Sequence, residues 1–397
     1  MRRHIAIILG SDENAYGCAR MLYELEAERS LVLCAKALPA TSHSGILERR
    51  VIPELDSPSV FRRTLEHTFK SLKNVAERIT VIPCSDYYAE LLIKNRALCE
   101  KYVSNPIPTE RCYERFSTKA AFKRLCEELE ISHPKTEIII PSAELGQKKE
   151  RSFPLVLKPS NSNSFEYLHS KIENKRKVYI CENDGELQKA LEDFALEGYN
   201  LPAVIQEYIG GDERSYRVVN AYCDREGRAR IVGVGRPLLE YKNHAMIGNY
   251  AAVRSVKDRK LCDIAARILE KIGYVGFANF DVKIAPETND YVFLELNPRQ
   301  GRSSYYVRAS GENLMGAMYE DAVLDKEYTG LRYAEEDGVW INEPIGVIRR
   351  EMNERGLPSD DLDGVSAVRA LSLGYDFNIP RAFTLIRRNL GAYTRKI

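Results

Sequence analysis

The first hundred residues alternate short apolar runs with stretches of helical periodicity. Apolar runs cover residues 5–9, 31–33 and 79–82, and helical patterns cover residues 18–28 and 60–72. Strands that are apolar at every position are typical of a parallel sheet that helices cover on both faces. The pattern therefore predicts an α/β domain built on a doubly wound parallel sheet.

The loops that follow two of these predicted strands are candidates for ligand contact. Ligands of doubly wound sheets bind beyond the carboxyl ends of the strands, and here residues 10–17 and 84–88 lie there. The first loop lacks the Gly-x-Gly-x-x-Gly pattern of dinucleotide-binding turns. Its Gly10, Asp12 and Asn14 fit either a capped helix start or a ligand contact, and the sequence leaves both open.

The pattern changes at residues 104–108, where two prolines in three residues cannot continue a helix or a central strand. A helix is predicted over residues 117–130, and antiparallel hairpins follow it. The strands of the two predicted hairpins are residues 214–223 with 228–236, and residues 277–284 with 291–297. This part of the chain is therefore expected to be α+β. The expected domains are residues 1–108, residues 109–330 and a less patterned extension over residues 331–397.

Charge and cysteine usage exclude several classes of protein. The 397 residues include 58 Lys plus Arg and 57 Asp plus Glu, a net charge of +1, so no global positive field favours nucleic acid. No apolar run approaches the roughly 20 residues of a membrane span, and residues 5–9 are too short for a signal peptide. The nine cysteines form no Cys-x-x-Cys pair, which predicts reduced thiols. We expect a cytoplasmic protein.

The second hairpin carries the residues that most clearly indicate chemistry. Asp281 lies on its first predicted strand, and Glu295 and Asn297 share one face of its second strand. Two carboxylates and an amide oxygen are the ligands that Mg²⁺ prefers, together with substrate phosphates. Paired acids also occur on solvated strand faces, but the surrounding residues are apolar, so the hairpin predicts a magnesium site.

Two further segments are candidates for binding anions. Lys158 ends an apolar strand, where its ammonium group either meets a phosphate or reaches out to solvent. The polar residues 160–164 follow and form either a phosphate-binding loop or a flexible hairpin loop. Arg302, beside Ser303 and Ser304, is suited to gripping a carboxylate, or else forms a structural ion pair.

Taken in order, five separated elements resemble the ATP-grasp superfamily. They are Lys119, Lys158, the strand end at residues 206–213, Asp281, and Glu295-Leu296-Asn297-Pro298-Arg299. Further segments resemble the D-aspartate ligases of Gram-positive bacteria: residues 9–17, 217–222, 237–240, 247–250, 276–281 and 300–304. The resemblance covers roughly residues 5–320 and weakens beyond them.

The resemblance implies a fold and a set of roles. The fold would be a pre-ATP-grasp α/β domain followed by two α+β lobes that clamp ATP. Phosphates would be contacted by Lys119 and Lys158, and Mg²⁺ by Asp281, Glu295 and Asn297. The adenine would be lined by Glu207, Tyr208 and Ile209, and the ribose by Glu213. The substrate carboxylate would face Arg302, Ser303 and Ser304, while Arg299 would balance the charge that develops on the phosphate.

The expected activity is that of an ATP-dependent carboxylate–amine ligase acting through an acyl phosphate. By resemblance, the carboxylate is the side chain of D-aspartate and the amine is the lysine of a UDP-linked peptidoglycan precursor. Another ATP-grasp ligase would keep every ATP residue and change the acceptor. A biotin-dependent carboxylase normally accompanies an Ala-Met-Lys-Met motif, which is absent here. A nucleotide sensor would tolerate loss of the magnesium ligands, and all three are present.

The C-terminal segment suggests a second kind of contact. Residues 377–397 contain five basic residues and no acid, and Phe383, Ile386, Leu390 and Tyr393 follow helical spacing. Such a helix either contacts a membrane surface or docks on the protein with its basic face in solvent.

Overall fold

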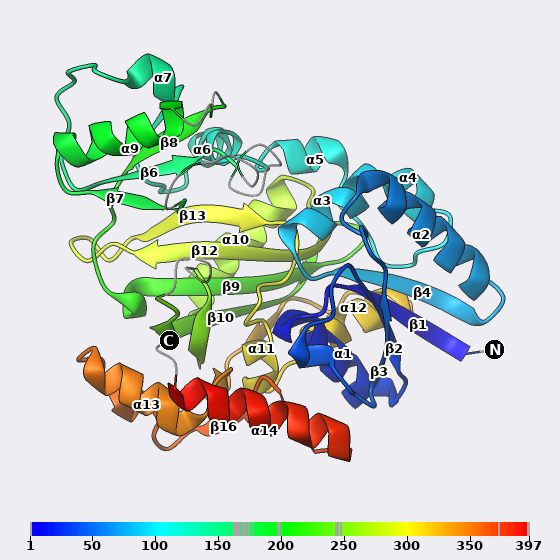
Figure 1. The fold of residues 1–397 in the computed structure, drawn as a ribbon. Coiled ribbons are helices and arrows are strands. Elements are labelled where there is room, and N and C mark those ends of the chain that lie inside the picture. The colour runs from blue at the N-terminus through cyan, green and yellow to red at the C-terminus, as the bar shows by residue number, and fades with distance from the viewer. Residues whose placement is uncertain are drawn as a thin grey trace.

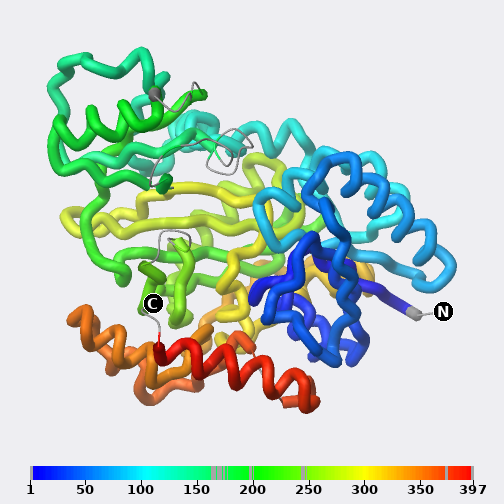
Figure 2. The backbone as a smooth tube through the Cα atoms, in the orientation of Figure 1, coloured from blue at the N-terminus to red at the C-terminus, as the bar shows by residue number. Residues whose placement is uncertain are grey.

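The computed structural model describes residues 2–161, 167, 172, 175–176, 178–196, 199, 201–242, 246, 248–371 and 374–394. Three β-sheets organise these residues, and Figures 1 and 2 show them following one another along the chain. Their order explains how distant segments reach one site.

The first sheet is parallel and has the strand order β3-β2-β1-β4. Its strands are β1 (Arg2–Leu9), β2 (Ser30–Cys34), β3 (Leu47–Val51) and β4 (Ala76–Pro83). The connecting helices include α1 (Glu13–Glu26), α2 (Pro58–Leu72), α3 (Asp86–Lys94) and α4 (Arg96–Cys99). Alternate residues of β1 bury toward opposite faces, with Ile8 in one core cluster and Ile7 in another. The predicted parallel α/β fold is confirmed.

In this domain the first helix begins earlier than predicted, and one strand was missed. The loop over residues 10–17 is helical from Glu13, because Asp12 caps α1 by accepting a hydrogen bond from the Ala15 amide at 3.1 Å, which confirms the capped helix start of the two interpretations. Strand β3 was not predicted, because its sequence Leu-Glu-Arg-Arg-Val is polar in the middle. It lies at the sheet edge, where exposed charged side chains are tolerated.

The second sheet is antiparallel, with the strand order β5-β8-β6-β7. Its strands are β5 (Thr136–Ile139), β6 (Leu155–Pro159), β7 (Tyr179–Cys181) and β8 (Ala203–Glu207). Helices α5 (Glu110–Glu114) and α6 (Lys119–Glu128) lead into it, and α7 (Pro141–Glu144) and α9 (Asp184–Leu196) belong to it. Leu157, Leu187 and Phe194 form its core with no exposed surface.

The third sheet is the largest and follows the order β13-β12-β9-β10-β11-β15-β16, with β14 pairing β10. Its strands are β9 (Tyr216–Cys223), β10 (Ala229–Glu240), β11 (Tyr250–Val256), β12 (Gly276–Ile284), β13 (Tyr291–Asn297), β14 (Arg332–Ala334), β15 (Gly338–Ile341) and β16 (Ser366–Arg369). Both predicted hairpins are present, as β9–β10 and β12–β13. The last three strands come from the segment after residue 330.

Five helices accompany the third sheet, and the last of them runs along one edge of the molecule (Figure 1). They are α10 (Arg259–Lys271), α11 (Tyr306–Ala309), α12 (Leu314–Ala322), α13 (Ile345–Glu354) and α14 (Ile379–Thr394). No helix in the described part of the chain is long and apolar enough to cross a membrane.

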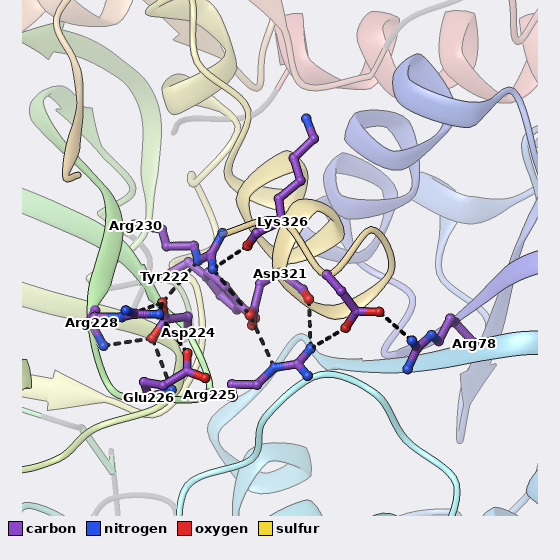
Figure 3. Close-up of polar contacts among 10 residues, drawn as sticks. Arg78, Tyr222, Asp224, Arg225, Glu226, Arg228, Arg230, Asp321 and Lys326 are labelled. Carbon is purple, nitrogen blue, oxygen red and sulfur yellow. Dashed lines mark hydrogen bonds and ion pairs between the residues drawn. The ribbon is translucent and has the colours of Figure 1, made fainter. Parts of the chain in front are cut away.

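The first and third sheets are joined by a shared core and by a charged network. Tyr16 of α1 lies in the same apolar cluster as Tyr306 and Trp340. In the charged network, part of which is drawn in Figure 3, Arg78 of β4 pairs with Asp325 at 2.5 Å, and Arg225 lies 3.3 Å from the same carboxylate. These contacts hold the loops of the first domain beside the third sheet.

Candidate active site

The β12–β13 hairpin sets the predicted metal ligands beside one another. Asp281 is directly opposite Glu295 in the strand register, and Asn279 is opposite Asn297. A bulge follows Asp281, because Leu294 has no partner on β12. The Asn297 amide donates to the Asn279 side-chain oxygen at 3.3 Å, which orients it.

The electrostatics of this pair favour a bound cation. Burial and the neighbouring Glu295 raise the pKa of Asp281 to about 7. Like charges that face each other across two strands destabilise a sheet. Within the described residues no group of three or more His, Cys, Asp or Glu side chains could hold a metal alone. The carboxylates of Asp281 and Glu295 and the amide oxygen of Asn297 are hard donors that fit Mg²⁺, an ion that takes one or two carboxylates together with phosphates and water.

Two lysines approach this pair from the second sheet and from the helix that precedes it. Lys119 begins α6, whose Thr118 cap accepts a hydrogen bond from the Ala121 amide at 3.1 Å. Its ammonium lies 3.8 Å from Glu295. Lys158 lies on β6, where burial and the positive charge of Lys119 lower its pKa to about 8. Two cations held this close indicate a site for a strongly anionic ligand.

A cavity of about 240 Å³ unites these groups. Lys119, Lys158, Asp281, Glu295 and Arg299 line it, as do four residues to which the sequence analysis gave no individual role: Asp86, Tyr216, Glu240 and Tyr250. Asn297 lines an adjoining cavity with Lys119 and Glu295. The cavity therefore collects most of the predicted phosphate and metal residues from the second sheet, the third sheet and helix α6, and Asp86 reaches it from the first domain.

Asp86 is the missed residue with the clearest role. Its carboxylate receives Arg299 in a two-point contact, with Nε at 2.8 Å and Nη2 at 3.0 Å. Asp86 begins α3, immediately after β4. Asp86 belongs to the loop at residues 84–88, which the sequence analysis selected because it follows a predicted strand. The sequence thus indicated where Asp86 lies, but not that it pairs with Arg299.

The predicted adenine segment follows β8 and is fixed by a buried lysine. The Lys283 ammonium donates to the Ile209 carbonyl at 2.6 Å and to the Gly211 carbonyl at 3.3 Å. It also lies 5.1 Å from the centre of the Tyr208 ring. Lys283 thus joins strand β12 of the β12–β13 hairpin to the linker between the second and third sheets.

The acids at the two ends of this linker have partners of their own. Glu207 accepts a hydrogen bond from the Lys135 amide at 2.9 Å. Glu213 lies 3.6 Å from Arg355, which follows α13 in the C-terminal extension. Neither Glu207 nor Glu213 is among the described residues that line the 240 Å³ cavity.

Arg302 lies apart from the cavity and faces the first domain. Its Nη2 is 2.5 Å from Glu13, and its Nε is 3.7 Å from Asp12. Ser303 and Ser304 are buried beside it, with 5% and 2% of their surface exposed. Arg302, Ser303 and Ser304 are not among the described residues that line the cavity. The predicted loop residues Ser162, Asn163 and Ser164 lie outside the described residues.

The comparisons with known proteins agree with this geometry. The family model of the ATP-grasp domain matches residues 116–303. A D-aspartate ligase from Enterococcus faecium (strain Aus0004) is 34% identical over 349 residues, covering 86% of this chain and 82% of that protein.

Solved structures share the fold at low sequence identity. An L-amino acid ligase from Bacillus licheniformis aligns with a TM-score of 0.57 at 15% identity, over 81% of this chain and 75% of that one. A biotin carboxylase from Campylobacter jejuni in complex with an ATP analogue aligns with a TM-score of 0.59 at 15% identity, over 84% and 74%. The similarity to the D-aspartate ligase and the match to the ATP-grasp family model show that the chain belongs to the ATP-grasp superfamily, as an ATP-dependent ligase that joins a carboxylate to an amine and converts ATP to ADP and phosphate.

Proposed function

We propose that this ligase joins D-aspartate, through its side-chain carboxylate, to the lysine amine of a UDP-linked peptidoglycan precursor in the cytoplasm. The similarity to the enterococcal D-aspartate ligase supports the choice of substrate. The observation that carries the chemistry is the cavity in which Lys119, Lys158 and Arg299 surround the Asp281–Glu295 pair. A ligase for other amino acids is the alternative, favoured by the fold shared with the L-amino acid ligase.

The reaction has two steps. A carboxylate oxygen attacks the γ-phosphorus of ATP, and the bond to the β–γ bridging oxygen breaks to release ADP. The amine nitrogen then attacks the acyl carbon, loses a proton, and expels phosphate. Neither step needs a nucleophile from the protein, because positioning and charge neutralisation are sufficient for phosphoryl transfer.

Each predicted residue has a place in this proposal. Lys119 and Lys158 contact phosphates, and Arg299, held by Asp86, balances the charge on the transferred group. Asp281, Glu295 and Asn297 would hold Mg²⁺, which neutralises phosphate charge when it is bound. Glu207, Tyr208 and Ile209 line the adenine, and Glu213 binds the ribose. Arg302, which pairs with Glu13 in the free protein, would exchange that contact for the amino-acid carboxylate, with Ser303 and Ser304 beside it.

An acyl-phosphate intermediate predicts that one oxygen of the substrate carboxylate ends up in the released phosphate. D-Aspartate labelled with ¹⁸O in its side-chain carboxylate should transfer one label to inorganic phosphate, because that oxygen leaves with phosphorus. Mass spectrometry of the released phosphate measures this transfer, and L-aspartate is the matched control. Labelled AMP, or phosphate without label, would contradict the acyl phosphate. Equal turnover of D- and L-aspartate would contradict the choice of D-aspartate as the substrate but not the acyl phosphate.

A substitution at Arg302 tests the amino-acid site. Arg302→Lys keeps the charge but loses the two-point grip on a carboxylate, so we expect KM for the amino acid to rise about tenfold and KM for ATP to change little. Arg308→Lys is the control, since Arg308 pairs at 2.8 Å with Glu24 on the surface. Steady-state kinetics with each substrate varied in turn gives both constants. An amino-acid KM unchanged in Arg302→Lys would remove Arg302 from the substrate site.

A further inference from the structure

Helix α14 presents an apolar stripe to solvent. Ile379, Phe383, Ile386, Leu390 and Tyr393 recur every three or four residues and therefore lie on one face. Their exposed fractions range from 52% at Ile386 and Tyr393 to 71% at Phe383. Phe377, just before the helix, is 64% exposed. Scattered exposed apolar residues are normal, but a continuous stripe marks an interaction site.

The opposite face of α14 is the one that docks on the protein, and it contains two arginines. Leu385 and Ala392 are buried there. Arg381 has no exposed surface and pairs with Asp376 at 2.6 Å, and its guanidinium lies 4.3 Å from the centre of the Tyr16 ring. Arg388 lies 3.4 Å from Glu13 and donates to the Asn342 carbonyl at 2.9 Å.

This orientation is the reverse of the docked arrangement that the sequence analysis considered. That arrangement placed the basic face in solvent, whereas Arg381 and Arg388 point inward and the apolar stripe points outward. Burying a guanidinium is unfavourable unless an anion pairs with it. Asp376, which is itself buried, is the anion that pairs with Arg381. The ion pairs therefore fix the helix in the orientation that leaves its apolar stripe uncovered.

Charge identifies what covers this stripe. Arg387 is exposed and is a helical neighbour of Leu390, and the sequence continues after the described helix with Arg395 and Lys396. No acid occurs from residue 377 to residue 397. A second copy of the chain would bring the same positive charges to the contact, whereas an anionic lipid surface supplies the opposite charge.

We propose that α14 binds the surface of an anionic membrane, lying in the plane of the interface with its stripe among the acyl chains. A helix of 16 residues is about 24 Å long, which is enough for contact along the surface. Figure 1 shows α14 running along the outer edge of the molecule. This proposal does not depend on the ligase substrate.

Vesicle sedimentation of the full chain tests the proposal. The wild-type protein should sediment with phosphatidylcholine vesicles that contain phosphatidylglycerol at least tenfold more strongly than with phosphatidylcholine alone. Salt should weaken this binding, since it screens charge. The double substitution Phe383→Ser and Leu390→Ser should reduce binding at least tenfold, and Arg387→Glu should reduce it severalfold. Ile180→Ser is the matched control, because Ile180 is 50% exposed on β7.

The same variants separate the proposal from its rivals. ATP turnover with water-soluble substrates should be unchanged in Phe383→Ser with Leu390→Ser, which shows that the protein is folded. Binding that is equal in the wild type and the double variant would overturn the proposal. So would a dimer, seen by analytical ultracentrifugation without lipid, that this double substitution dissociates, because the stripe would then be covered by a second copy.

Discussion

Glu295→Gln is expected to lower kcat roughly 100-fold, the size of effect seen when one charge-stabilising group is removed from an active site. The protein should nevertheless stay as stable as the wild type or become slightly more stable. Glu295 faces Asp281 directly across the hairpin, so in the absence of a cation the substitution removes a like-charge contact, and the part-exposed contact with Lys119 at 3.8 Å that is lost with it contributes little. Relief of such a contact is worth up to about 1 kcal/mol. Activity should thus fall while stability does not.

Steady-state turnover at saturating Mg²⁺ and thermal melting without nucleotide measure the two effects. Glu287→Gln is the matched control, because it removes the same charge from the exposed turn of the same hairpin. Near-native turnover of Glu295→Gln would exclude Glu295 from the metal site. A strong loss of stability in Glu295→Gln would mean instead that the carboxylate serves the fold.

The β12–β13 hairpin, which contains Asp281 and Glu295, shows how much of the site could be predicted from the sequence. Alternating apolar residues set the strands, and the short turn over residues 285–290 set their pairing, so Asp281 and Glu295 could be placed on adjacent strands before the structure was known. The register that puts them directly opposite each other depends on the bulge after Asp281, which has no local sequence signal.

The contacts between domains could not be predicted in this way. Asp86 and Arg299 are 213 residues apart, and Glu13 and Arg302 are 289 apart. Composition and periodicity describe one element at a time, whereas these ion pairs depend on how the first and third sheets pack. For the same reason the sequence placed α14 correctly as a helix but could not decide which face would dock. That choice depends on Asp376, Glu13 and Asn342, which lie on other segments.

The second large effect concerns Lys158. Lys158→Ala should lower kcat/KM for ATP by about 10- to 150-fold, because a hydrogen bond to a charged group contributes about 1.5–3 kcal/mol. Lys189→Ala is the control, since Lys189 is an exposed lysine on α9 of the same lobe. Unchanged ATP kinetics in Lys158→Ala would make Lys158 a residue of the cavity wall without a role in binding.

The pH dependence of ATP binding gives a second measurement on the same residue. Burial and Lys119 lower the pKa of Lys158 to about 8 in the free protein, while bound phosphate favours the charged ammonium and raises that pKa. The contribution of Lys158 to ATP affinity should therefore be constant below pH 8 and fall as the pH rises above it, by up to tenfold per pH unit until the pKa of the bound state is reached. Lys158→Arg keeps its charge throughout this range, so its ATP affinity should stay nearly level. Isothermal titration calorimetry of the wild type and Lys158→Arg between pH 7 and pH 9.5 decides the point, and parallel pH profiles would show that another group titrates.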